Sequence, residues 1–152
     1  MPLPARALHL EITEGALLND EPAANANLAK LHRLGTRLEL DDFGTGYSSL
    51  ARLQLLPVAG VKLDQAFIAP IEHSFSAQAV VRAAIEMAHA LGKYVVAEGV
   101  ENPGQHALLC TMACDFIQGH HLSAALPAAR FAELVREAAV SGASGRQSSV
   151  RL

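Results

Sequence analysis

Acidic and other polar side chains recur at the ends of apolar runs along this 152-residue chain. The runs have the length and composition of strands in a parallel sheet, which is buried on both faces and therefore mostly apolar. The polar residues at or near the ends of successive runs are Glu11, Asp41, Lys62, Glu98 and Gln118. The carboxyl ends of parallel strands lie along one edge of a sheet, where barrel enzymes form their active sites, so we expect these side chains to converge.

The acids in this set indicate a metal site. Glu11, Asp41, Asp42 and Glu98 would repel one another strongly if all were ionised in a half-buried cluster. A hard divalent cation would neutralise them, and carboxylate oxygens suit Mg²⁺ or Mn²⁺, whereas no converging set of His and Cys residues favours zinc. Adjacent acids can bind or bridge two ions, and two ions about 3.5–4 Å apart stabilise the attacking and leaving oxygens in a displacement at phosphorus. The residues therefore favour metal-dependent phosphoester hydrolysis.

Each of these features also has an ordinary structural interpretation. An isolated Asp-Asp pair is most often a solvated turn or a helix cap, and a single lysine such as Lys62 is most often on the surface. Gly44-Thr45-Gly46 lacks the fuller spacing of a phosphate-binding loop. His120 and His121 are sequence neighbours that point apart on a strand, so we expect at most one of them near the site. The joint pattern, rather than any single residue, favours a functional site.

The elements that must position these groups alternate between strand-like runs and helical patterns from Leu8 to about Val140, as in βα units. The expected strands are Leu8–Ile12, Arg37–Leu40, Gly60–Leu63, Tyr94–Ala97 and Asp115–Ile117, and the clearest helix is Ser76–Leu91. A complete (β/α)₈ barrel requires about 250 residues. The pattern therefore predicts an α/β fold, a partial (β/α)₈ TIM-type barrel with about five parallel strands and flanking helices. Residues 141–152 are polar and rich in Gly, which predicts a disordered tail.

The composition, 51% hydrophobic and 18% charged, is that of a globular domain. A net charge of −3 with scattered Lys and Arg predicts neither duplex nucleic acid nor a membrane as a partner. No run approaches the ~20 apolar residues of a membrane-spanning helix, so we expect a cytoplasmic chain. Cys110 and Cys114 have no second pair beside them and are expected to be buried free thiols.

Several segments resemble successive motifs of the EAL-domain family, in the family's order and spacing. They are Leu-His-Leu-Glu-Ile-Thr-Glu at 8–14, Asp-Asp-Phe-Gly-Thr-Gly-Tyr-Ser-Ser-Leu at 41–50, Val-Lys-Leu-Asp at 61–64, Val-Ala-Glu-Gly-Val-Glu at 96–101, Gln-Gly at 118–119 and Leu-Pro at 126–127. The resemblance covers roughly Leu8 to Val135. It identifies residues 1–140 as the C-terminal portion of an EAL domain.

The resemblance implies a barrel that cleaves cyclic di-GMP to linear pGpG with two Mg²⁺ or Mn²⁺ ions. By matched position it implies metal ligands at Glu11, Asp41, Asp42 and Glu98. It implies catalytic roles for Glu98, as the general base or holder of the attacking water, and for Lys62, beside that water and the scissile phosphate. It further implies substrate-binding or supporting roles for Gln118, Asp64, Glu14 and Glu101.

The sequence also departs from the family pattern. The Glu-Ala-Leu tripeptide that names the family occurs nowhere in it, and the metal-binding Asn of the next upstream strand is missing too. We therefore expect the chain alone to be inactive or nearly so. An incomplete barrel exposes strand edges, so we expect a homo-oligomer or a partner that covers them. Three alternatives stay open: a non-catalytic module that binds cyclic di-GMP or a protein partner, a remnant without function, and, more remotely, an aldolase-like phosphate barrel.

Overall fold

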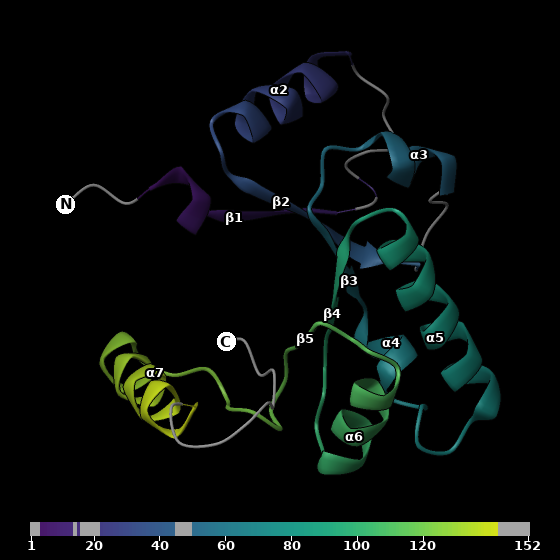
Figure 1. The fold of residues 1–152 in the computed structure, drawn as a ribbon, viewed down its shortest axis with the longest axis vertical. Coiled ribbons are helices and arrows are strands. Elements are labelled where there is room, and N and C mark those ends of the chain that lie inside the picture. The colour runs from purple at the N-terminus through teal and green to yellow at the C-terminus, as the bar shows by residue number, and fades with distance from the viewer. Residues whose placement is uncertain (1–3, 14, 16–21, 45–49, 143–152) are drawn as a thin grey trace.

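A computed structural model describes residues 4–13, 15, 22–44 and 50–142 of the chain. Its centre is a five-stranded parallel sheet in which the strands lie side by side in chain order (Figure 1). The strands are β1 (His9–Thr13), β2 (Arg37–Phe43), β3 (Gly60–Leu63), β4 (Tyr94–Ala97) and β5 (Phe116–Ile117). Within the described ranges, β1 and β5 each pair with a single neighbouring strand, so the sheet is open at both edges. The predicted α/β partial barrel is confirmed.

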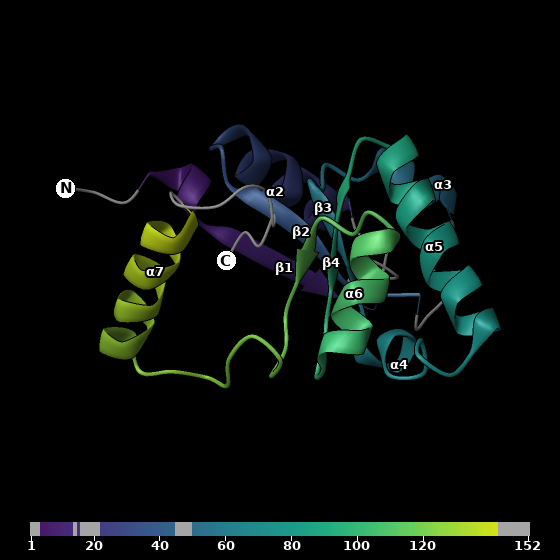
Figure 2. The ribbon, with the colours of Figure 1, turned by 60° about the horizontal axis from the view of Figure 1, so that its bottom comes forward.

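Helices surround the outside of this curved sheet. In chain order the helices are η1 (Ala5–Ala7), α2 (Pro22–Arg33), α3 (Leu50–Leu55), α4 (Gln65–Ile68), α5 (Phe75–Ala90), α6 (Pro103–Thr111) and α7 (Ala128–Gly142). Helices α2, α3, α5 and α6 lie on the outer side, whereas α7 stands apart across the open, inner side of the sheet (Figures 1 and 2). The inner side is therefore where side chains from the strands remain accessible.

Alternation along the strands separates an apolar outer face from a polar inner face. Successive strand residues point to opposite faces, and Leu38, Leu40, Val61, Val95 and Ala97 are all buried on the helix-covered side. Helix α5 contributes Val81, Ile85 and Ala88 to the same core. Each fully buried Val, Leu or Ile side chain in this core stabilises the fold by about 1.5–3 kcal/mol. The core thus holds the strands that position the polar inner residues.

The structure departs from the sequence-based expectations in the bounds of some elements and in one of the two thiols. Strand β2 continues through both aspartates to Phe43 instead of ending at Leu40. Helix α7 ends at Gly142, and residues 143–152 of the predicted tail lie outside the described part of the chain. Cys110 is exposed, so the expectation of two buried thiols is wrong for this residue. In the described residues, no helix combines the length and apolar character needed to cross a membrane.

Candidate active site

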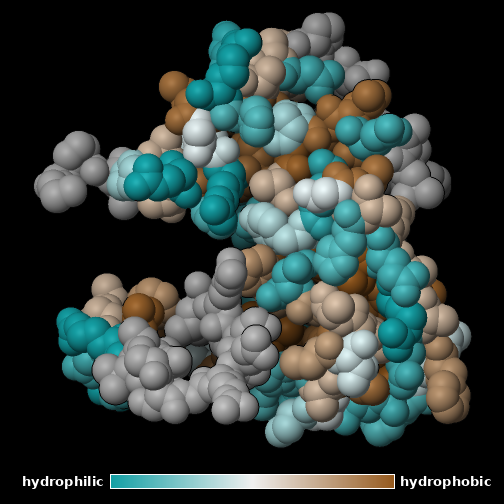
Figure 3. Space-filling model, in the orientation of Figure 1, coloured by the Kyte–Doolittle hydropathy of each residue, from teal (hydrophilic) through white to brown (hydrophobic). Residues whose placement is uncertain are grey.

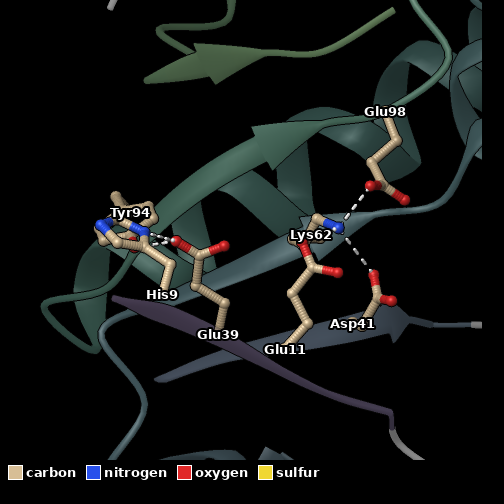
Figure 4. A network of polar contacts seen from close by, with 7 residues as sticks. All are labelled: His9, Glu11, Glu39, Asp41, Lys62, Tyr94 and Glu98. Carbon is tan, nitrogen blue, oxygen red and sulfur yellow. Dashed lines mark hydrogen bonds and ion pairs between the residues drawn. The ribbon is translucent and has the colours of Figure 1, made fainter. Parts of the chain in front are cut away.

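Lys62 of β3 lies at the centre of the acidic residues (Figure 4). Its Nζ atom is 2.7 Å from Oε1 of Glu11, 3.3 Å from Oδ1 of Asp41 and 2.6 Å from Oε1 of Glu98. The side chain of Lys62 is 5% exposed, those of Asp41 and Glu98 are about one-fifth exposed, and that of Glu11 is half exposed. The structure thus brings four of the predicted site residues together at the carboxyl edge of the sheet.

The strand register explains this convergence. Residue 13 of β1 pairs with Asp41 of β2. Glu11 lies two residues before residue 13, so both point to the inner face of the sheet. Residue 63 of β3 pairs with Ala97 of β4, and the backbone N–H of Glu98 continues the ladder by donating to the carbonyl of Leu63 at 3.0 Å. Because residues two apart on a strand share a face, these offsets aim the carboxylates toward Lys62.

The surrounding carboxylates keep Lys62 positively charged. Burial would by itself lower the pKa of Lys62, but hydrogen bonds to Glu11 and Glu98, with the negative charges of Glu98 and Asp41, raise that pKa above its usual value. Lys62 is therefore an ammonium group at neutral pH. It supplies part of the positive charge that the sequence led us to assign to a divalent cation alone.

Asp41 has a buried oxygen that accepts no hydrogen bond. This oxygen is its Oδ1 atom, which forms an ion pair with Nζ of Lys62 at 3.3 Å. A buried carboxylate oxygen without a hydrogen bond is costly, and the ammonium of Lys62 offsets part of that cost. This oxygen is the feature of the site that best fits a hard metal ion.

The four predicted ligands have the right chemistry for such an ion, but their positions do not form a complete site for it. All four predicted ligands offer carboxylate oxygens, which suit Mg²⁺ or Mn²⁺. Across the described residues, however, no three Asp, Glu, His or Cys side chains come close enough together to hold one ion. Glu11, Asp41 and Glu98 gather around the ammonium of Lys62 and do not enclose a metal ion.

Asp42 lies at an irregular point of β2, where the register with β3 shifts. Its φ angle of 56° lies in the left-handed region, which aspartate tolerates better than most residues. The register between β2 and β3 shifts between Leu40 and Phe43, as at a β-bulge. A bulge re-aims consecutive side chains, so the two adjacent aspartates need not point to opposite faces of the sheet.

The remaining predicted residues have more local surroundings. Asp64 caps α4, since its Oδ1 accepts from the N–H of Ala66 at 2.8 Å. Glu101 accepts from Nε2 of Gln65 at 3.3 Å. Gln118 directly follows β5 and lines the cavity on the inner side of the sheet. Glu14 lies outside the described residues.

A second group of polar side chains, His9, Glu39 and Tyr94, lies on the same inner face, two residues before Glu11 and Asp41 along β1 and β2 (Figure 4). The sequence did not lead us to predict this group. The buried carboxylate of Glu39 accepts a hydrogen bond from the Tyr94 hydroxyl, and its Oε1 is 2.8 Å from Nδ1 of His9. Burial, followed by the hydrogen bond to Glu39, raises the pKa of Tyr94. Residues 9 and 11 lie on the same face of β1, and residues 39 and 41 lie on the same face of β2. This two-residue spacing was the signal in the sequence that could have revealed the second group.

The inner face of the sheet and α7 border a cavity of about 800 Å³. Its lining includes Lys62, Gln118, Tyr94 of β4 and Phe116 of β5, and Phe131 of α7. The space-filling view shows the molecule hollowed on the side between the β1 end of the sheet and α7 (Figure 3). Of the Lys62 cluster, Lys62 itself thus borders a space that a ligand can enter.

Sequence comparison identifies the protein family to which these residues belong. The family described as "EAL domain" matches residues 2–125. Cyclic di-GMP phosphodiesterase NbdA of Pseudomonas aeruginosa is 44% identical over 134 residues, which cover 88% of this chain and 17% of NbdA. The chain spans less than a fifth of the length of this relative.

Solved structures give the same result for the fold. A PaMucR phosphodiesterase in complex with c-di-GMP superposes with a TM-score of 0.79 at 36% identity, covering 85% of this chain and 52% of that protein. Klebsiella pneumoniae BlrP1, in a complex with manganese and cyclic di-GMP, superposes with a TM-score of 0.72 at 30% identity, covering 78% of this chain and 30% of BlrP1.

Proposed function

Since this chain belongs to the EAL domain family, we propose that its Lys62 cluster acts in the metal-dependent hydrolysis of cyclic di-GMP to linear pGpG. The observation that carries the proposal is the convergence of Glu11, Asp41 and Glu98 on Nζ of Lys62 within 3.3 Å. The relatives named above as phosphodiesterases, and the complexes with cyclic di-GMP, support this substrate.

In this proposal Glu11, Asp41, Asp42 and Glu98 hold Mg²⁺ or Mn²⁺ through carboxylate oxygens. When bound, the ions supply positive charge that favours ionisation of a water molecule and stabilises the phosphate oxygens. The buried oxygen of Asp41 that accepts no hydrogen bond supports a cation at this position. The manganese complex of BlrP1 supports a divalent ion in this family.

Glu98 and Lys62 have complementary tasks in the reaction. Glu98 is about one-fifth exposed, so it is reachable by water, and its carboxylate accepts the proton of the attacking water. Lys62 cannot serve as a base because its pKa is raised. Its ammonium instead stabilises the negative charge that grows on the phosphate oxygens in the transition state. Gln118, Asp64 and Glu101 are assigned to substrate contacts or to supporting this arrangement.

A non-catalytic module that binds cyclic di-GMP or a protein partner is the second candidate. It is favoured by one observation: among the described residues, the carboxylates surround a lysine and no three potential ligands enclose an ion. We accordingly propose that the 152-residue chain alone shows little or no turnover. Activity would require further oxygen ligands at the same rim.

The open edges of the sheet suggest what else the chain contacts. In the described part, β1 and β5 each have one unpaired edge, and exposed backbone of this kind pairs readily with other strands. We propose that a second copy or another polypeptide covers these edges. We also propose a cytoplasmic location, in keeping with a cyclic dinucleotide as substrate.

Hydrolysis and binding should be measured separately. Purified chain is incubated with cyclic di-GMP and Mn²⁺, the products are separated by chromatography, and Glu98→Gln serves as the matched control. Binding is followed by ligand-detected NMR, with Lys62→Met as the control. We expect binding that weakens at least tenfold in Lys62→Met, and no pGpG above the level of Glu98→Gln.

The possible outcomes separate the two parts of the proposal. Formation of pGpG that disappears in Glu98→Gln would overturn the claim of inactivity and strengthen the catalytic assignment. Absence of both binding and hydrolysis would overturn the assignment of cyclic di-GMP to this site.

A further inference from the structure

Two histidines from separate segments face each other near the carboxyl edge of the sheet, called the rim below. Nδ1 of His106, on α6, is 3.2 Å from Nε2 of His121, in the turn that follows β5. Their ring centroids are 5.3 Å apart and their planes are tilted by 59°, so the rings approach through their nitrogens and do not stack. The partner of His121 is therefore a distant residue, not its neighbour His120.

We propose that His106 and His121 form a site for a divalent transition-metal ion that prefers imidazole nitrogen, such as Ni²⁺ or Zn²⁺. Metal–nitrogen bonds of about 2.0–2.1 Å at angles of about 90–109° hold two ligand nitrogens about 2.8–3.4 Å apart. The observed 3.2 Å lies within that interval. The terminal torsion of histidine is soft, so small ring rotations aim both lone pairs at one point.

This site differs in chemistry from the Lys62 cluster. The cluster offers carboxylate oxygens, which favour Mg²⁺ or Mn²⁺, whereas the pair offers imidazole nitrogens, which favour later transition metals. Within the described residues no third Asp, Glu, His or Cys joins the two histidines, so the other coordination positions are filled by water. The ion is therefore held at moderate affinity and exchanges with solvent.

An ion at this position would connect α6 to the backbone beside the rim. The N–H of His121 donates to the carbonyl of Val100 at 2.9 Å, and the N–H of Val100 donates to the carbonyl of Gln118 at 3.0 Å. Val100 lies two residues after Glu98, in the same loop. Metal binding would thus fix the Gln118–His121 turn and the Glu98 loop against one helix.

A simple hydrogen bond between the rings is the competing explanation, and Ni²⁺ distinguishes the two. Cys110 is exposed and lies one helical turn after His106, so every variant carries Cys110→Ser to remove a competing thiol. The chain is titrated with Ni²⁺ in a large excess of Mg²⁺, which occupies oxygen sites. Binding is followed by thermal unfolding and by paramagnetic broadening of the histidine ring signals in NMR spectra.

We expect Ni²⁺ to raise the unfolding temperature and to broaden the His106 and His121 signals first. His106→Gln and His121→Gln should each lower the affinity at least tenfold. His120→Gln is the matched control, because it removes a histidine from the same turn and leaves the pair intact. Should His121→Gln fail to fold, as judged by circular dichroism, His106→Gln carries the test.

Two results would overturn the site. One is an unfolding temperature that does not respond to Ni²⁺ in the parent chain. The other is equal affinity in His106→Gln and His120→Gln, which would place the ion elsewhere and leave the pair as a hydrogen bond.

Discussion

The ring of Tyr94 lies directly over the backbone of Gly60, so a β-carbon at residue 60 would be 2.2 Å from Cε2 of the ring. The ring cannot easily move, because its hydroxyl donates to Glu39 and its edge contacts Phe116 at a centroid distance of 5.2 Å. We predict that Gly60→Ala lowers the free energy of unfolding by about 1–3 kcal/mol, as overpacking does in other cores. Urea denaturation measures the change.

The matched control for this prediction is Gly15→Ala, since a β-carbon at residue 15 meets nothing within 4 Å. A double variant, Gly60→Ala with Tyr94→Ala, should lose less stability than the sum of the two single changes, because the clash is removed. A Gly60→Ala variant as stable as Gly15→Ala would contradict the close packing of Tyr94 on β3.

Tyr94 should ionise at higher pH than an ordinary tyrosine. Burial, then the hydrogen bond to Glu39 and its negative charge, raise the pKa of Tyr94 above its usual 10.0. For an acid with a raised folded-state pKa, the unfolded state loses its proton first, so stability falls as the pH rises above 10. Absorbance at 295 nm should show one of the chain's two tyrosines ionising with unfolding. Tyr94→Phe should remove that component, and its persistence would disprove the assignment.

The two cysteines should react at very different rates. Cys110 is exposed, whereas burial raises the pKa of the Cys114 thiol to about 11, which leaves little thiolate near neutral pH. With a disulfide reagent at pH 8, we predict one fast thiol and a second that reacts at least about tenfold more slowly until the chain unfolds. Cys110→Ser should abolish the fast phase. A fast phase in that variant would show that Cys114 is accessible.

The sequence predicted the strands well because buried parallel strands are short, continuous apolar runs. The observed bounds of β3 and β4 are the predicted ones, and α5 was placed within one residue at each end. Strand β2 was predicted to end at Leu40, because the apolar run stops there and two aspartates follow it. In the structure a bulge keeps them within the strand.

The sequence predicted only the part of the polar inner face that lies at the strand ends. Searching the strand ends found Glu11, Asp41, Lys62 and Glu98, but it missed the second group of polar side chains. Nothing in the sequence shows that Gly60 leaves room for Tyr94 to reach across β3 to Glu39. The pairing of His106 with His121 was equally hidden, since it depends on how α6 packs beside the turn after β5.

Removing the ammonium of Lys62 should turn the acidic cluster into a better cation site. The folded-state pKa of Lys62 is raised, so its stabilising effect is fully present below 10.5 and declines only as the pH rises through the folded-state value. At pH 7, Lys62→Met should therefore lower the free energy of unfolding, by about 1–3 kcal/mol because the carboxylates retain some solvent.

Mn²⁺ should restore more stability to Lys62→Met than to the parent chain, since the freed oxygens of Glu11, Asp41 and Glu98 can then approach the ion. Lys93→Met is the matched control: Lys93 is also buried, but its Nζ binds the carbonyls of Leu56 and Val58 at 3.2 and 2.8 Å. Unfolding temperatures with and without Mn²⁺ measure the difference. Equal Mn²⁺ shifts in both variants and the parent would show that these carboxylates do not bind the cation.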